Sequence, residues 1–214
     1  MPLYALNDSL WFPPVEDALP DGLLAMGGDL SIERLLLAYK NGIFPWYDGN
    51  VPLWWCPNPR FVLFPDELKV SKSMQSLLKK NAFDFTINQA FEEVINQCKE
   101  TKRKDQDGTW IKDEVEDAYI QLHQQGYAHS AEAWIDGELV GGLYGIRLGK
   151  VFYVESMFSK KSNASKYAFI KYATQLKAEG IVLIDCQIHT QHLESMGAKM
   201  IMRQQFTQLI KHLV

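Results

Sequence analysis

Polar residues interrupt two apolar stretches in the C-terminal half of the chain. Asp185 and Gln187 follow the apolar residues 181–184, and Glu155 lies within the stretch 151–158. Side chains two residues apart leave the same face of a β-strand, so Asp185 and Gln187 should point together. On adjacent strands, the three residues would form an acidic, hydrogen-bonding pocket suited to a cationic amine. Ordinary polar groups at strand ends would explain the same spacing.

The segment after the Glu155 stretch argues against one class of acyl donor. Acyltransferases with an N-acetyltransferase-like fold that use acyl-coenzyme A bind its pyrophosphate through glycine-spaced backbone amides at the start of a helix. Residues 159–166 read Ser-Lys-Lys-Ser-Asn-Ala-Ser-Lys and contain no glycine. The sequence therefore disfavours coenzyme A.

Other residues that could carry chemistry also have ordinary structural explanations. Tryptophan can stack on nucleic-acid bases, at roughly 1–3 kcal/mol per base, but it is more often a core or interface anchor. The tryptophans considered are Trp46, Trp54, Trp55 and Trp110. His189 and His192 have no third ligand nearby, and the cysteines lack CxxC spacing, so no metal site is predicted.

Prolines, glycines and aromatic residues dominate the N-terminal part of the chain. Residues 1–30 contain Pro-Pro, Pro-Asp-Gly and Gly-Gly steps and are expected to form loops and turns. A helix is predicted over residues 32–41. Residues 43–60 are poor material for regular structure because their prolines remove hydrogen-bond donors. We interpret residues 1–60 as a small lobe packed on a main domain of residues 61–214.

Hydrophobic periodicity defines the elements of the main domain. Helical spacing predicts helices over 71–81, 87–98, 112–126 and 164–178. A period of two predicts strands over 128–135, 138–148, 151–158 and 181–188, the first two joined by the hairpin signal Asp136-Gly137. The order hairpin, strand, helix, strand is typical of an α+β, N-acetyltransferase-like (GNAT-like) acyltransferase domain. In that plan, two parallel strands splay apart and the ligand enters between them.

The composition is that of a globular protein. Of its 214 residues, 47% are hydrophobic and 22% are charged. No apolar run reaches the roughly 18–20 residues that a membrane span needs, and the first residues do not resemble a secretory signal. The number of cysteines is three, which argues against a disulfide framework. We therefore expect a reduced, cytoplasmic protein without membrane association.

Charge is distributed unevenly along the chain. The net charge is -4, but residues 69–104 contain eight basic and four acidic residues. A local basic face can hold phosphates through counterion release, even on an acidic protein. A solvated helix face would explain the same charges.

Eight segments, in order and spread over nearly the whole chain, match one known family. They are GLLAMGGDLSIERLLLAYKNGIFPWY (22–47), PLWWCPNPRFVLFP (52–65), GTWI (108–111), HSAEAWIDGELVGGLYG (129–145), ESMFS (155–159), NASK (163–166), LIDCQ (183–187) and HLESMGA (192–198). On these motifs the chain resembles the leucyl/phenylalanyl-tRNA–protein transferases.

This resemblance implies a GNAT-like domain with a smaller N-terminal lobe. It also implies transfer of Leu, and less readily Phe or Met, from aminoacyl-tRNA to proteins or peptides with N-terminal Arg or Lys. Such transfer marks proteins for degradation by the N-end rule. The aminoacyl ester is already activated, so no cofactor or covalent nucleophile is expected. We expect a monomer, since no long exposed apolar edge is evident.

The resemblance also assigns residues to roles. Asp185 and Gln187 match the catalytic pair, and Glu155 lies beside them. Trp46 of FPWY and Trp110 of GTWI match the aromatic pair that sandwiches the terminal adenosine.

Further residues are implied to bind the substrates. Tyr39, in the first matching segment, is expected to bind substrate, and a basic helix is expected to face the tRNA through Lys72, Lys79 and Lys80. Together with periodicity, the resemblance predicts an apolar pocket for the transferred side chain. Its expected members are Leu143, Phe152, Met157, Phe169, Tyr172 and Ile184.

The expected mechanism is attack of an α-amine on the aminoacyl ester. Asp185 would orient Gln187, and one of the two would accept a hydrogen bond from the amine. Glutamine is a very poor base, so proton transfer would involve Asp185 or the leaving ribose hydroxyl. Glu155 would hold either the amine or the acceptor side chain. Asp185→Ala is expected to retain tRNA affinity and lose transfer.

Two alternative functions stay open on the residues alone. One is an acyl-CoA-dependent N-acyltransferase with the same fold. The other is a non-catalytic module that binds tRNA or basic N-terminal degradation signals without transferring anything.

Overall fold

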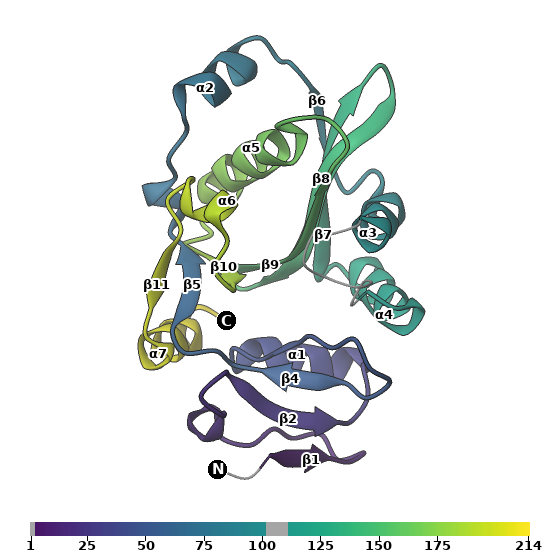
Figure 1. Cartoon of the computed structure of the whole chain (residues 1–214), viewed down its shortest axis with the longest axis vertical. Helices are drawn as coiled ribbons and strands as arrows, with labels where there is room; N and C mark the ends of the chain where they lie inside the picture. Colours follow the sequence, from purple (N-terminus) through teal and green to yellow (C-terminus); the bar gives the residue numbers. More distant parts are fainter. Residues whose placement is uncertain (1–2, 102–110) are drawn as a thin grey trace.

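The computed structural model describes residues 3–101 and 111–214, and their strands form two sheets. The smaller sheet has the strand order β1-β2-β4-β3. Its strands are β1 (Tyr4–Leu6), β2 (Leu23–Gly27), β3 (Phe44–Pro45) and β4 (Leu53–Trp55). Together with helix α1 (Ile32–Lys40), this sheet lies at one end of the molecule (Figure 1).

The larger sheet forms the centre of the molecule and has the order β11-β5-β10-β9-β8-β7-β6 among the described residues. Its strands are β5 (Arg60–Leu63), β6 (Asp84–Ile87), β7 (Ala128–Ile135), β8 (Glu138–Leu148), β9 (Val151–Ser159), β10 (Leu183–Gln187) and β11 (Lys199–Ile201). Strands β9 and β10 are parallel neighbours, connected through helix α5 (Ala164–Ala178).

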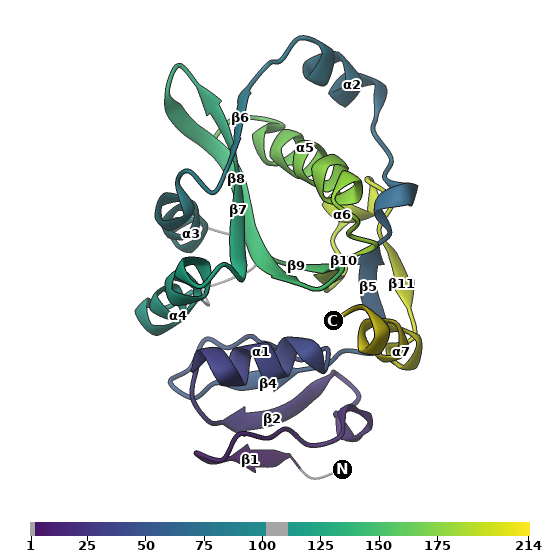
Figure 2. The ribbon, with the colours of Figure 1, turned by 180° about the vertical axis from the view of Figure 1, so that it is seen from behind.

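Helices cover both faces of the larger sheet. Helix α5 packs on one face against β7, β8 and β9, while α3 (Phe91–Glu100) and α4 (Asp113–Gln124) cover the other (Figures 1 and 2). The remaining α-helices of the described residues are α2 (Lys72–Lys79), α6 (Gln191–Glu194) and α7 (Arg203–Leu213). Short 3-10 turns occur at Val15–Asp17 and Pro65–Glu67.

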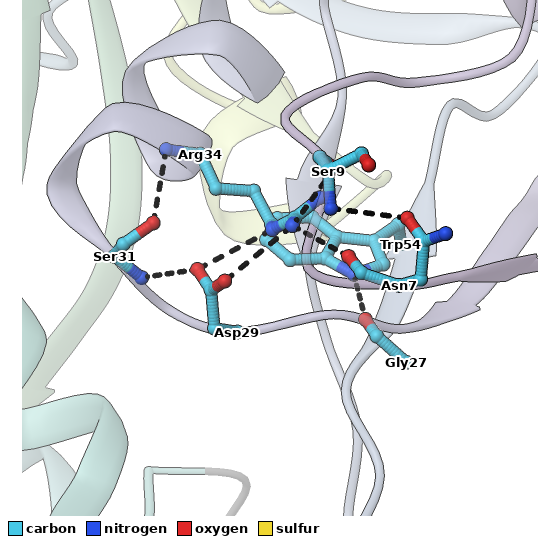
Figure 3. Close-up of polar contacts among 7 residues, drawn as sticks. All are labelled: Asn7, Ser9, Gly27, Asp29, Ser31, Arg34 and Trp54. Carbon is cyan, nitrogen blue, oxygen red and sulfur yellow. Dashed lines mark hydrogen bonds and ion pairs between the residues drawn. The ribbon is translucent and has the colours of Figure 1, made fainter.

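A buried arginine ties the N-terminal sheet to α1. The Arg34 side chain donates through Nη2 to the carbonyls of Asn7, at 2.8 Å, and Ser9, at 3.1 Å (Figure 3). Its Nε also donates to Asp29 Oδ1 at 3.3 Å. Gly28 has a φ of +73°, and a Cβ there would lie 3.1 Å from the guanidinium carbon. Because Gly28 has no Cβ, the Gly-Gly-Asp turn leaves room for the Arg34 side chain.

The structure confirms the predicted class and the order of the main elements. The hairpin strands have the predicted bounds, and both Asp136 and Gly137 have positive φ, as a tight two-residue hairpin turn requires. Helix α5 also has its predicted bounds. The protein is an α+β structure in which hairpin, strand, helix and strand follow one another as on the N-acetyltransferase plan.

Three predictions about local structure are wrong. The first thirty residues contain strands β1 and β2, and the segment 43–60 contains β3 and β4. Pro45 is tolerated in β3 because this strand lies at the edge of the sheet, where a missing N–H donor leaves no partner unpaired. Residues 84–87 pair with β7 as β6, so the helix predicted from residue 87 begins instead at Phe91. In addition, strand β11 and helix α7 follow the last predicted strand, in a segment for which no element is predicted.

None of the helices in the part of the chain that the structure describes is long and apolar enough to cross a bilayer.

Candidate active site

The parallel strands β9 and β10 separate beyond their third residue pair. Pairing runs from Leu183 opposite Val151 to Asp185 opposite Tyr153 and then ends. A pocket of about 540 Å³ opens there, lined by residues 154–159 of β9 and by residues 186–188. This is the splay that the predicted fold requires.

A bulge on each strand aims a polar side chain at this opening. Opposite β8, Val154 and Ser156 are paired and Glu155 is the extra residue. Opposite β5, Asp185 and Gln187 are paired and Cys186 is the extra residue. Bulges re-aim side chains, because they break the strict alternation of a strand.

Glu155 and Gln187 meet across the gap between the strands. Gln187 Nε2 donates to Glu155 Oε1 at 3.0 Å, and both residues line the pocket. Since a carboxylate only accepts hydrogen bonds, this contact assigns the amide nitrogen of Gln187 to Glu155 and leaves Gln187 Oε1 as the acceptor atom. The pair therefore offers a carboxylate and an amide oxygen to a ligand amine.

Of the two residues predicted to accept a hydrogen bond from the amine, Gln187 lines the pocket and Asp185 does not. Its side chain is completely buried, and its carboxylate is held by Arg60 through two hydrogen bonds of 2.8 and 2.6 Å. Its Oδ1 also accepts from the backbone N–H of Gln187 at 3.0 Å. These donors come from within the protein, so Asp185 can reach the pocket only through Gln187.

Two tyrosines support the Glu155 carboxylate from the opposite side. Tyr119 of α4 donates to Glu155 Oε2 at 3.0 Å, and the hydroxyls of Tyr39 and Tyr119 are hydrogen-bonded to each other. Tyr39, which is predicted to bind substrate, is completely buried and does not line the pocket. Burial raises the pKa of both tyrosines well above its usual value, so both remain neutral hydrogen-bond donors.

The environment of Glu155 brings its titration to neutral pH. Burial raises the pKa of Glu155 to about 7, although hydrogen bonds from Tyr39 and Tyr119 act to lower it. The Asp185 carboxylate raises the pKa further, and the Arg60 guanidinium lowers it. The side chain is half-buried because it opens into the pocket. A carboxyl group with such a pKa can exchange a proton with an amine near pH 7.

Most of the predicted apolar pocket is core. Met157 lines the pocket beside Glu155. The other five residues belong to the buried cluster between α5 and the sheet, in which two residues of α5 pack with three residues of the strands: Phe169 and Tyr172 with Leu143, Phe152 and Ile184. The apolar walls also include four residues that are not among the predicted site residues, namely Phe44, Val154, Phe158 and Leu193.

Of the tryptophans, Trp46 lies at the pocket. It is half-buried in the segment after β3, and its carbonyl accepts from Trp55 Nε1 at 2.6 Å. Trp54 is completely buried and belongs to the core. Trp110 lies outside the described residues.

His192, for which no metal-binding role is predicted, lines the same pocket. Its Nε2 is buried and has no hydrogen-bond partner among the described residues. Burial lowers the pKa of His192 to about 4, and nearby Lys166 acts in the same direction. The imidazole is therefore neutral near pH 7. Among the residues that the structure describes, His, Cys, Asp and Glu side chains form no cluster suited to a metal ion.

Two groups of lysines lie outside this pocket. Lys72, Lys79 and Lys80 are exposed on and just after α2, which lies at the end of the molecule opposite the small sheet (Figure 1). The glycine-free segment before and at the start of α5 lines a smaller hollow of about 280 Å³, with Lys160 and Lys161 among its residues.

Comparison with known proteins gives one family. A model described as leucyl/phenylalanyl-tRNA protein transferase matches residues 62–211, and one for the N-terminal domain of the same transferase matches residues 28–58. The leucyl/phenylalanyl-tRNA–protein transferase of Syntrophobacter fumaroxidans is 54% identical over 211 residues, which cover 98% of this chain and 90% of that relative. The protein of the same name from Flavobacterium johnsoniae is 55% identical over 210 residues, covering 98% and 99%. Among solved structures, L-PGS from Bacillus licheniformis has a TM-score of 0.43 and 13% identity, covering 78% of this chain and 54% of that one.

Proposed function

Because the chain belongs to the leucyl/phenylalanyl-tRNA–protein transferase family and is therefore an aminoacyltransferase, we propose that it acts through the Glu155–Gln187 pair. The donors are leucyl-tRNA and, less readily, phenylalanyl- and methionyl-tRNA. The acceptors are proteins with N-terminal Arg or Lys, which the added residue directs to degradation by the N-end rule in the cytoplasm. The observation that carries the proposal is the carboxylate–amide contact of 3.0 Å at the mouth of the splayed strands.

The proposed reaction exchanges one acyl bond for another. The α-amine nitrogen of the acceptor attacks the ester carbonyl carbon, a C–N bond forms, and the bond between that carbon and the ribose oxygen breaks. Gln187 Oε1 accepts a hydrogen bond from the amine and orients it, and Glu155 accepts its proton. The ribose oxygen leaves with the proton that Glu155 has accepted, so Glu155 is regenerated and neither an oxidant nor a further reactant is needed.

Glu155 replaces Asp185 as the proton acceptor for two physical reasons. Its pKa of about 7 is close to the reference value of about 7.7–8.0 for an α-amine, which favours proton transfer between them. The Asp185 carboxylate is already held by Arg60 and by Gln187 N. The negative charge of Glu155 also suits a cationic N-terminal residue.

We propose that the donor end of the tRNA lies against Trp46 and Met157. An indole stacks on any base, and a hydrophobic pocket separates side chains that differ by a methylene by only about 1–3 kcal/mol. Leu, Phe and Met should therefore all be transferred. Trp110 is the proposed second aromatic partner of the terminal adenosine.

We also propose that the protein acts as a monomer and that its chain has two parts. A small lobe of residues 1–60 contributes Trp46, and a transferase domain of residues 61–214 contributes Glu155 and Gln187. The separate sheets and the two family models, which match residues 28–58 and 62–211, support this division.

One assay separates this function from its rivals. The protein is incubated with a peptide that begins with Arg and with leucyl-tRNA, and mass spectrometry should find one leucine added at the N-terminus. The same peptide with a blocked N-terminus should stay unchanged, and acetyl-CoA should not replace leucyl-tRNA. Binding of both partners without product would support a non-catalytic module, and acetylation would support the CoA-dependent alternative.

Removal of the Trp46 indole should weaken the donor complex. Trp46→Ala should raise the KM for leucyl-tRNA by about five- to 150-fold, since a stacked base contributes roughly 1–3 kcal/mol. Initial rates at varied leucyl-tRNA measure this change. Trp11→Ala, which removes a partly exposed indole outside the pocket, is the matched control and should leave KM unchanged. An unaltered KM in Trp46→Ala would place the base elsewhere.

Charge reversal on α2 should weaken tRNA binding in a salt-dependent way. Each phosphate contact contributes roughly 0.7–0.9 to the slope of log K against log salt. Replacement of Lys72, Lys79 and Lys80 by Glu should therefore reduce that slope by about 2–3. Binding is measured by filter retention between low and moderate salt. Reversal of the exposed Lys40, Lys150 and Lys211 is the matched control, and equal effects in both variants would mean that binding follows net charge alone.

A further inference from the structure

Arg60, the first residue of β5, is completely buried beside the splayed strands. Its guanidinium carbon lies 4.7 Å from the ring centre of Phe44 and 4.6 Å from that of Phe206. Phe44 belongs to the small sheet and lines the pocket, and Phe206 belongs to the C-terminal helix α7. The Arg60 side chain thus contacts the small sheet through Phe44, helix α7 through Phe206 and strand β10 through Asp185.

The guanidinium reaches the pocket through two further residues. Arg60 Nε and Gln187 N both donate to the same oxygen of Asp185, at 2.8 and 3.0 Å. Gln187 has a φ of +61°, in the left-handed region that non-glycine residues rarely occupy. Such a conformation persists only where the surroundings determine it, and here the Asp185 carboxylate supplies that constraint. This backbone conformation of Gln187 directs its Nε2 toward Glu155 Oε1.

Stability alone is a weak explanation for this buried ion pair. Removing two charges from water often costs more than their attraction returns, and a well-packed apolar pair can be equally stable. The pair is also incompletely satisfied, since Arg60 Nη1 has no hydrogen-bond partner among the described residues. The arrangement therefore suggests a role in geometry.

We propose that Arg60 is a positioning residue for the transfer reaction, which orients Gln187 through Asp185 and holds Phe44 against the pocket. The inference rests on the proposed function of the Glu155–Gln187 pair. It assigns a role in the transfer reaction to a residue of β5 that does not contact the substrate. Its two parallel donors fix the plane of the Asp185 carboxylate, which a single ammonium group cannot do.

The central test compares the stability and the turnover of an apolar replacement. Arg60→Met should lower the urea midpoint, because Asp185 is left buried without its partner. The double variant Arg60→Met/Asp185→Leu should recover most of that midpoint. Its kcat for leucine transfer should nevertheless remain about 100-fold below wild type, the loss expected from a misplacement of about 1 Å, while its KM for leucyl-tRNA changes less than about threefold.

A conservative variant keeps the test decisive if the double variant fails to fold. Arg60→Lys retains the charge and loses the second donor, so its kcat should fall about tenfold with an unchanged KM. Arg34→Met is the matched control, since Arg34 is a similarly buried arginine whose side chain hydrogen-bonds to Asp29 and to the carbonyl of Asn7, away from the pocket. It should lower the urea midpoint and leave the kcat of the folded protein unchanged.

The outcomes separate this inference from the proposed function. If the double variant or Arg60→Lys transfers leucine with the kcat of wild type, the positioning role of Arg60 is wrong and the proposed function stands. If wild type adds no leucine to the Arg peptide, the proposed function itself is wrong. A parallel fall of kcat in Arg34→Met would attribute the loss to general destabilisation.

Discussion

Glu155→Gln is expected to lower the kcat of leucine transfer by about 10²–10⁴-fold, the contribution typical of a positioned general base. Glutamine fills the same space and can still hydrogen-bond Gln187, so the fold and the KM for leucyl-tRNA should change little. Single-turnover rates with an Arg peptide measure the loss. Glu132→Gln is the matched control, because Glu132 is a buried glutamate that accepts hydrogen bonds from Ser130 and Thr86 away from the pocket.

The pH dependence of this variant provides a second readout. The pKa of Glu155 is raised to about 7, so the carboxylate form increases as the pH rises through 7, and kcat/KM should rise with it. A further rise near 7.7–8.0 belongs to the α-amine of the acceptor. The lower transition should disappear in Glu155→Gln and the upper one should remain. A lower transition that survives the substitution would contradict the role of Glu155.

The same shift makes stability depend on pH in the opposite sense. Because the pKa of Glu155 is higher in the folded state than its ordinary value of 4.5, the folded protein binds more protons between pH 4.5 and 7. The contribution of this group to the free energy of unfolding is therefore fully present below about pH 4.5 and is lost as the pH rises through 7. Urea midpoints of wild type and Glu155→Gln, compared at pH 5 and 8, should converge at the lower pH.

Asp185→Ala is expected to reduce the free energy of unfolding by about 3–5 kcal/mol, because it leaves the Arg60 charge buried and unpaired. This adds a loss of stability to the expectation that the variant retains tRNA affinity and loses transfer. Urea denaturation monitored by tryptophan fluorescence measures the change. Asp185→Asn keeps an oxygen for Gln187 N and should lose less stability.

A surface ion pair supplies the control for this prediction. Asp113 is 95% exposed and pairs with Lys99, so Asp113→Ala should leave the urea midpoint close to that of wild type. If Asp185→Ala had the urea midpoint of wild type, the Arg60–Asp185 pair would not be buried in solution.

The sequence predicts those parts of the fold that depend on local patterns. Alternating residues and Asp136-Gly137 determine the β7–β8 hairpin, and the apolar face of residues 164–178 determines α5. The small sheet is not predictable in this way, because its short strands are separated by prolines and pair with partners far away in the chain. The order of the elements is thus easier to predict from the sequence than the residues at which they begin and end.

The candidate site shows the same division. Its residue types are visible in the sequence, because Glu155 and Gln187 interrupt apolar strands. The role of Arg60 is not visible, although its position directly before Phe61-Val62-Leu63 is a signal that it enters the core. Two bulges shift the register by one residue each, and no local pattern specifies them.

By itself, the sequence determined the family, the α+β order of elements and the types of the acidic and amide residues at the candidate site. These depend on residue type and on short-range periodicity, which act within a few positions along the chain. Only the tertiary structure decided that Asp185 turns inward to Arg60 and that Glu155 meets Gln187. The reason is that burial and hydrogen bonding join residues 32 and 125 positions apart, and their energies exist only once the strands are packed.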